Sequence, residues 1–120
     1  MKIGISTKDN KLESSLDERF GRAPGFIIYD LASETFSYIK NEQNLTAAQG
    51  AGIQAAQNLV NSGADALITG NVGPKAYQVL SAAGIEVYLA ANMTVNESIL
   101  KFKKGQLEKA AKNNVEGHWV

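Results

Sequence analysis

The residues best suited to binding chemistry stand in a short glycine-rich segment, residues 70–74. Gly70 and Gly73 allow the backbone to turn tightly around Asn71, and Pro74 suits the first position of a helix. The free N–H groups and the positive dipole end of such a helix attract anions. The segment therefore predicts a site for an anion or an electron-rich ligand. The alternative, that the glycines only make a short turn, stays open.

A second segment with binding chemistry is residues 20–24. Arg22 offers a planar fork of N–H donors, and Gly21 permits close approach of a ligand to the backbone. Arg19 adds positive charge three positions earlier. Phe20 either belongs to the site or anchors the preceding loop in the core while the arginines face solvent, and the sequence leaves both open.

Further polar residues are predicted at the same site. Gln49 lies in the first turn of a helix predicted over residues 46–61 and projects onto its apolar face, which indicates a polar partner there. Asn92 follows the last predicted strand. His118 is the single histidine and the one candidate metal ligand, although without cysteines it cannot complete a closed zinc site.

Known catalytic patterns do not occur in this sequence. Lys75 is followed by Ala76, where a Walker A loop needs a serine or threonine for magnesium. A ribonuclease-H-type nuclease needs carboxylates on its first strand and after its fourth, but residues 3–5 and 69–71 contain none. One histidine makes a Ser-His-Asp triad improbable. We therefore expect a binding or carrier protein and not an enzyme.

Length and composition favour one cytoplasmic domain. The 120 residues fit a single domain, with a core over residues 1–105 and a loosely packed tail over residues 106–120. Twelve basic and twelve acidic residues balance, which gives no support for a nucleic-acid or membrane partner. No apolar run approaches the length of a membrane span, and no signal peptide is evident.

The hydrophobic periodicity predicts an α/β fold in the order β-β-β-α-β-α-β-α. The expected strands are residues 2–6, 25–30, 35–40, 65–69 and 85–89, and the expected helices are 46–61, 74–83 and 94–105. Residues 7–19 are polar and are predicted to form a long loop. Thr46 is expected to cap the first helix, and Thr94 and Glu97 form a capping box before the third.

This order predicts a mixed five-stranded sheet in the order 3-2-1-4-5, with strand 2 antiparallel and helices on both faces. That is the ribonuclease-H-like three-layer α/β/α arrangement. A flavodoxin-like fold ranks second, because it needs a helix between the first two strands. Ligands of such sheets bind beyond the carboxyl ends of the parallel strands, where residues 20–24 and 70–74 are expected to converge.

Four sequence stretches resemble the dinitrogenase iron–molybdenum cofactor biosynthesis family, the NifX-type domain also found at the C-terminus of NifB proteins. They are Phe20-Gly21-Arg22-Ala23-Pro24-x-Phe26, Gly50-Ala51-Gly52-Ile53-Gln54-Ala55-Ala56-Gln57, Thr69-Gly70-Asn71-Val72-Gly73-Pro74-Lys75-Ala76 and Ala83-Gly84-Ile85-x-Val87-Tyr88. The similarity runs to about residue 107. Family members often place a histidine where Arg19 stands, and some place a cysteine where Ala23 stands.

The resemblance implies a ribonuclease-H-like fold without nuclease activity and a carrier of iron–sulfur or iron–molybdenum clusters or their precursors. Cluster-biosynthesis proteins are the partners it implies. The competing hypothesis is a regulatory or interaction module that binds a small phosphate- or carboxylate-bearing ligand at the same place. The residues alone do not decide between the two.

Overall fold

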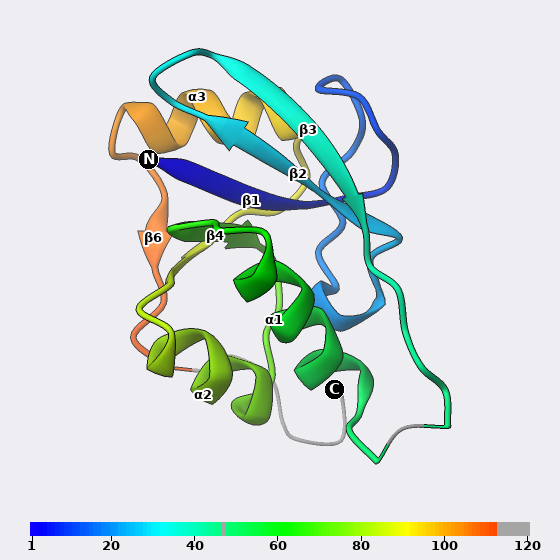
Figure 1. Ribbon diagram of the computed structural model, residues 1–120. Coiled ribbons are helices and arrows are strands. Elements are labelled where there is room, and N and C mark those ends of the chain that lie inside the picture. The colour runs from blue at the N-terminus through cyan, green and yellow to red at the C-terminus, as the bar shows by residue number, and fades with distance from the viewer. Residues whose placement is uncertain (47, 113–120) are drawn as a thin grey trace.

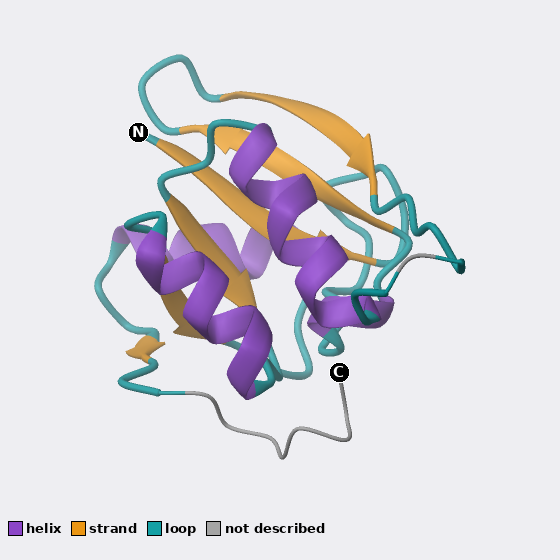
Figure 2. Cartoon of the chain, turned by 60° about the horizontal axis from the view of Figure 1, so that its bottom comes forward, coloured by secondary structure: helices purple, strands orange, loops and turns teal. Residues whose placement is uncertain are grey.

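The centre of the molecule is one six-stranded mixed sheet, seen in the computed structural model of Figures 1 and 2, which describes residues 1–46 and 48–112. The strands are β1 (Lys2–Thr7), β2 (Gly25–Asp30), β3 (Thr35–Lys40), β4 (Ala66–Thr69), β5 (Glu86–Leu89) and β6 (Glu108–Lys109). The helices are the 3-10 turn η1 (Phe20–Arg22) and α1 (Ala51–Asn61), α2 (Pro74–Ala82) and α3 (Val95–Lys103). A mixed α/β fold is therefore confirmed.

The strands lie in the order β3-β2-β1-β4-β5-β6. β1 pairs in parallel with β4, and β4 with β5, whereas β2 runs antiparallel to both β1 and β3. The predicted order of the first five strands is correct, and so is the direction of β2. As a result β1, β3, β4 and β5 all end at one side of the sheet, which we call its carboxyl end.

The prediction of five strands missed β6, and residues 106–110 are not a loose tail. β6 pairs antiparallel with β5, and its Lys109 forms an ion pair of 2.7 Å with Glu86. The next residue, Ala110, is buried and donates its N–H to the carbonyl of Val87 at 2.8 Å. The sequence could not show β6, because two exposed charged residues carry no apolar alternation.

Helices lie on both faces of the sheet (Figure 2), and apolar side chains of the central strands are buried against them on each face. Side chains alternate along β2: Phe26 and Ile28 pack in the core formed with α1 and α2, and Ile27 and Tyr29 pack in the core formed with α3. The central strands therefore read as continuous apolar runs instead of alternating ones.

The first helix begins at Ala51 and not at Thr46, so Thr46 does not cap it. Gly50 is the N-cap, and the hydroxyl of Thr46 donates to Asn44 Oδ1 at 2.8 Å within the preceding loop. Gln49 therefore precedes the helix and does not lie on its apolar face. The later helices begin as expected, α2 with Pro74 at its start and α3 with its capping box.

Residues 8–19 form the predicted long loop, since Thr7 is still part of β1, and several contacts fix this loop to the rest of the fold. Leu16 is buried, and its N–H donates to the carbonyl of Met93 at 3.0 Å. The N–H of Asp17 donates to the carbonyl of Ser6 at 2.9 Å, and the Asp17 side chain is 1% exposed. The loop thereby carries the chain in a defined path to η1, a turn that the sequence pattern did not predict.

The capping box at the start of α3 predicts a specific response to acid. The Thr94 N–H donates to Glu97 Oε1 at 2.9 Å, and this hydrogen bond holds the pKa of Glu97 below its ordinary value. A carboxyl whose pKa is lower in the folded state stabilises the fold above its unfolded-state pKa and loses that contribution as pH falls through the folded-state pKa. Glu97→Gln should therefore be less stable than the wild type at pH 7, and the difference should shrink as pH falls below the ordinary pKa of a glutamate and vanish below the folded-state pKa of Glu97.

Urea unfolding at a series of pH values measures this difference. Glu13→Gln, an exposed glutamate outside the capping box, is the matched control. A loss of unfolding free energy in Glu97→Gln that stays constant from neutral to acidic pH would contradict the stabilising role of the Glu97 carboxylate.

Candidate functional site

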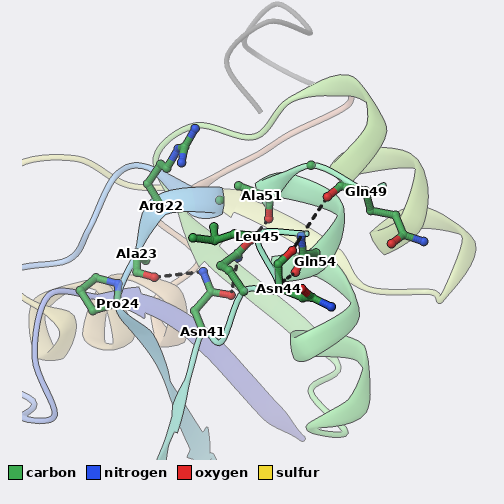
Figure 3. Close-up of a pocket in the computed structure, with 12 residues that line it drawn as sticks. Arg22, Ala23, Pro24, Asn41, Asn44, Leu45, Gln49, Ala51 and Gln54 are labelled. Atoms are coloured by element: carbon green, nitrogen blue, oxygen red, sulfur yellow. Dashed lines mark hydrogen bonds between the residues drawn. The ribbon is translucent and has the colours of Figure 1, made fainter. Parts of the chain in front are cut away.

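A pocket of about 490 Å³ opens at the carboxyl end of the sheet, between η1, the segment after β3 and the start of α1 (Figure 3). Its lining consists of small residues, one leucine, neutral amide side chains and one arginine. These residues are Gly21, Arg22, Ala23, Pro24, Asn41, Gln43, Asn44, Leu45, Gln49, Gly50, Ala51 and Gln54. The surface offers mainly N–H donors and carbonyl acceptors, and Arg22 is the one charged side chain among the lining residues.

One wall of the pocket is η1, which sits close to the first turn of α1. A Cβ atom at Gly21 would lie 3.0 Å from the backbone nitrogen of Gly52, so only glycine fits this approach without a shift. Phe20 is 1% exposed and its ring lies 5.4 Å from that of Phe26. Phe20 is therefore the anchor of the loop in the core, and its neighbour Arg22 is exposed at the pocket rim.

The floor of the pocket is a network of amide side chains around Asn41. Asn41 is 8% exposed and donates through Nδ2 to the carbonyl of Ala23 at 3.0 Å. Its Oδ1 accepts from Asn58 at 2.9 Å and from Gln43 at 3.2 Å. One side chain thus joins the end of β3 to the chain after η1 and to α1, which fixes the walls relative to one another.

Gln54 of α1 holds the remaining wall. Its Oε1 accepts from the Asn44 N–H at 2.6 Å, and its Nε2 donates to the carbonyls of Asn44 at 3.1 Å and Gln49 at 2.9 Å. All three bonds reach backbone groups, two at Asn44 and one at Gln49, and dashed lines mark such bonds in Figure 3. Leu45 stands on this wall and is 92% exposed, so the pocket has an apolar side chain at its mouth.

The start of α1 adds positive potential to the pocket. Gly50 caps the helix without a side-chain hydrogen bond, and the first turn contains no acidic residue. The backbone N–H groups of this turn and the helix dipole therefore act in the same direction as the charge of Arg22. The pocket is suited to a ligand with electron-rich outer atoms.

Arg19 differs from Arg22, because its charge is already paired. Its Nη2 lies 3.3 Å from Oδ2 of Asp17, and the hydrogen bond to Asp17 raises the pKa of Arg19. The Asp17 carboxylate is 1% exposed and also accepts the Arg19 N–H at 3.0 Å. Arg19 thus compensates a buried carboxylate, although its own side chain is 66% exposed.

Three further predicted site residues gather around Glu18 instead of the pocket. The Asn71 N–H donates to the Glu18 carbonyl at 2.6 Å, and the Asn92 N–H donates to Glu18 Oε2 at 2.9 Å. A Cβ atom at Gly70 would lie 2.5 Å from the Cβ of Glu18. Glu18 therefore joins the loops after β4 and β5, and Gly70 is required for the close approach. Gly73 is the buried N-cap of α2.

The structure thus brings together Gly21, Arg22 and Gln49 in the lining of the pocket, to which the residues around Glu18 do not contribute. His118 lies outside the described residues. The sequence analysis missed the amide network and Glu18, because a side chain that bonds to distant backbone leaves no local pattern. Within the described residues, no group of three or more histidine, aspartate or glutamate side chains could hold a metal ion.

The fold and this pocket define a small α/β domain with a pocket beyond the carboxyl ends of its parallel strands. The chain belongs to the dinitrogenase iron-molybdenum cofactor family, whose model matches residues 1–105. This confirms the resemblance seen in the sequence. Within the described residues, no helix is both long and apolar enough to cross a bilayer.

Two solved structures are similar over nearly the whole chain. The apo form of the orange protein from Desulfovibrio gigas is 43% identical, with a TM-score of 0.89 over 95% of this chain and 96% of that one. A candidate NifB protein from Thermotoga is 36% identical, with a TM-score of 0.81 over 97% and 98%. An uncharacterized protein from Methanocaldococcus jannaschii is 34% identical over 114 residues, 91% of each chain.

The role of Gln54 gives a prediction about the pocket wall. Gln54→Ala removes the acceptor of the Asn44 N–H and both bonds from Nε2, so that wall should open locally. We expect faster hydrogen exchange at the Asn44 amide and a loss of about 1 kcal/mol in the free energy of unfolding. Gln57→Ala, at an exposed position of the same helix, is the control. An unchanged rate of hydrogen exchange at the Asn44 amide in Gln54→Ala would refute this role of Gln54.

Proposed function

We propose that this chain is a non-enzymatic carrier that binds an anionic iron–sulfur or iron–molybdenum cluster, or a precursor of one, in the pocket between η1 and α1. The observation that carries the proposal is the pocket itself: the backbone N–H groups at the start of α1 and the exposed guanidinium of Arg22 meet there in a chain of this family. The cluster is cargo that enters and leaves, and the protein supplies no reaction step.

The chemistry of the lining fits the outside of such a cluster. Inorganic sulfide and thiolate atoms at a cluster surface accept hydrogen bonds, and the whole is negatively charged. The pocket side chains are guanidinium, carboxamide and aliphatic groups, which contact such atoms by hydrogen bonds, charge and packing. The described residues that line the pocket are therefore suited to contacts with the outer atoms of a cluster. Binding would depend on the charge and the shape of that cluster.

Membership in the family supports the same assignment. The family takes its name from the iron-molybdenum cofactor of dinitrogenase. The similar Thermotoga protein is called a NifB protein. We infer that cluster-biosynthesis proteins deliver or receive the cargo, that the chain works as a single cytoplasmic domain, and that its fold is the three-layer ribonuclease-H-like arrangement. A role for His118 as a metal ligand remains part of this proposal.

The alternative function is a regulatory or interaction module for a small phosphate- or carboxylate-bearing ligand at the same site. The single exposed arginine beside the start of α1 favours it, because this pair also suits one small anion. A thermal-shift screen of phosphate, nucleotides and dicarboxylates separates the two functions. A rise in Tm with one of these anions, and none with clusters, would establish the alternative.

The carrier function predicts a binding defect in Arg22→Ala. Loss of one charge-assisted contact, worth about 1.5–3 kcal/mol, should weaken cluster binding roughly 10–150-fold. Arg22 is an exposed side chain at the end of η1, so the Tm should stay nearly unchanged. The measurement is an anaerobic titration with a synthetic iron–sulfur cluster that carries small thiolate ligands, followed by visible absorption.

Two controls accompany this titration. Arg22→Lys keeps the charge and should lie between the wild type and Arg22→Ala. Lys75→Ala removes a charge that does not line the pocket. Failure of the wild type to form a complex at micromolar concentration would overturn the carrier function, and equal affinity in Arg22→Ala would remove Arg22 from the site.

A further inference from the structure

Leu45 is an apolar side chain that the packing of the domain does not use. It is 92% exposed, whereas the next most exposed large apolar side chain of the described residues, Met1, is 52% exposed. Leu45 belongs to neither of the two apolar cores. It lines the same pocket as Arg22, where Figure 3 shows both side chains. This leucine of the pocket is therefore in contact with water unless a ligand covers it.

The segment that carries Leu45 is tied to the rest of the fold by side-chain hydrogen bonds. Gln54 bonds to the N–H and the carbonyl of Asn44 at 2.6 and 3.1 Å. Nδ2 of Asn58 donates to the carbonyl of Glu42 at 3.0 Å. Exposed hydrogen bonds of this kind open at a lower cost in free energy than those of a buried strand ladder. Leu45 can therefore shift toward a ligand while α1 and the sheet stay in place.

The charged group of the pocket and its leucine favour the same kind of ligand. The guanidinium of Arg22 is more weakly hydrated than the ammonium group of a lysine. A leucine likewise favours outer atoms that lose their water at a low cost. Sulfur is a weak hydrogen-bond acceptor, whereas the oxygens of a phosphate or a carboxylate are strong acceptors that hold water firmly. The pair is therefore better suited to a sulfur-bearing surface than to a surface of oxygens.

We propose that Leu45 packs on the bound cargo and makes the pocket specific for an anion with a sulfide-bearing surface over an oxyanion of similar charge. This inference rests on the proposed carrier function and names the feature of the cluster that the pocket recognises. When Leu45 covers the ligand, it displaces water from the atoms that it touches. The displacement costs little at sulfide and much at a phosphate or carboxylate oxygen, so one contact strengthens cluster binding and disfavours the oxyanion.

The test compares two titrations, one with the synthetic thiolate-bearing cluster under anaerobic conditions and one with inorganic phosphate, followed by calorimetry. Leu45→Ala should weaken cluster binding about tenfold, because it removes most of the apolar contact. It should not weaken phosphate binding. Leu45→Met keeps an apolar side chain of similar size and should bind the cluster nearly as well as the wild type. Leu100→Ala, at an exposed leucine of α3, is the matched control and should change neither titration.

A second measurement detects the contact itself. A paramagnetic iron–sulfur cluster broadens the NMR signals of protons that lie close to it. The methyl signals of Leu45 should therefore broaden as the cluster is added to the wild-type chain, and those of Leu100 should stay sharp. Because Leu45 lies outside both cores, the Tm of Leu45→Ala should match that of the wild type, which separates a lost contact from a lost fold.

The outcomes distinguish this inference from the carrier function. If the wild type and Leu45→Ala bind the cluster with equal affinity, or if the Leu45 methyl signals stay sharp in the complex, the role of Leu45 is overturned and the carrier function stands. Equal weakening of cluster and phosphate binding would overturn the specificity, because Leu45 would then only shape the pocket. Failure of the wild type to bind the cluster would overturn both the carrier function and this inference.

Discussion

The close packing of η1 on the first turn of α1 is the constraint on which the pocket depends. Phe20 fixes η1 in the core by burial against Phe26, and Gly21 then allows the turn to approach the backbone of Gly52. Any side chain at Gly21 would separate these walls and change the shape of the pocket. The sequence suggested Gly21 as a point where a ligand approaches the backbone. In the structure Gly21 serves first to bring the backbone of η1 close to that of α1.

Charge in this region is divided between two arginines with different roles. Arg19 is bound to the buried carboxylate of Asp17, whose desolvation would be costly without a cation. Arg22 is exposed at the rim of the pocket, where no acidic side chain lines the surface. A ligand would have to displace Asp17 to use the full charge of Arg19, but it can meet Arg22 directly. This difference makes Arg22 the stronger candidate for recognition of an anion.

The elements that bury apolar side chains could be predicted from the sequence, and those held by polar contacts could not. β2, β4 and α2 follow their apolar patterns, and the capping box at Thr94 is a local signal that the structure confirms. The start of α1 was misplaced because Thr46 looks like a cap, whereas Gln54 keeps the preceding segment out of the helix through bonds to Asn44 and Gln49. Such bonds run from one side chain to backbone groups earlier in the chain, and no periodicity of residue types indicates them.

The same limit applies to the candidate site. The sequence predicted Arg22 and Gln49 as binding residues near the carboxyl end of the sheet. The fold brings both of them into the lining of one pocket. Asn71 and Asn92 carry equally suitable groups, yet both are bound to Glu18, whose role depends on the close approach of Gly70. The end of β3 leads directly into the pocket, because Lys40 is the last residue of the strand and Asn41 begins the amide network that joins the pocket walls.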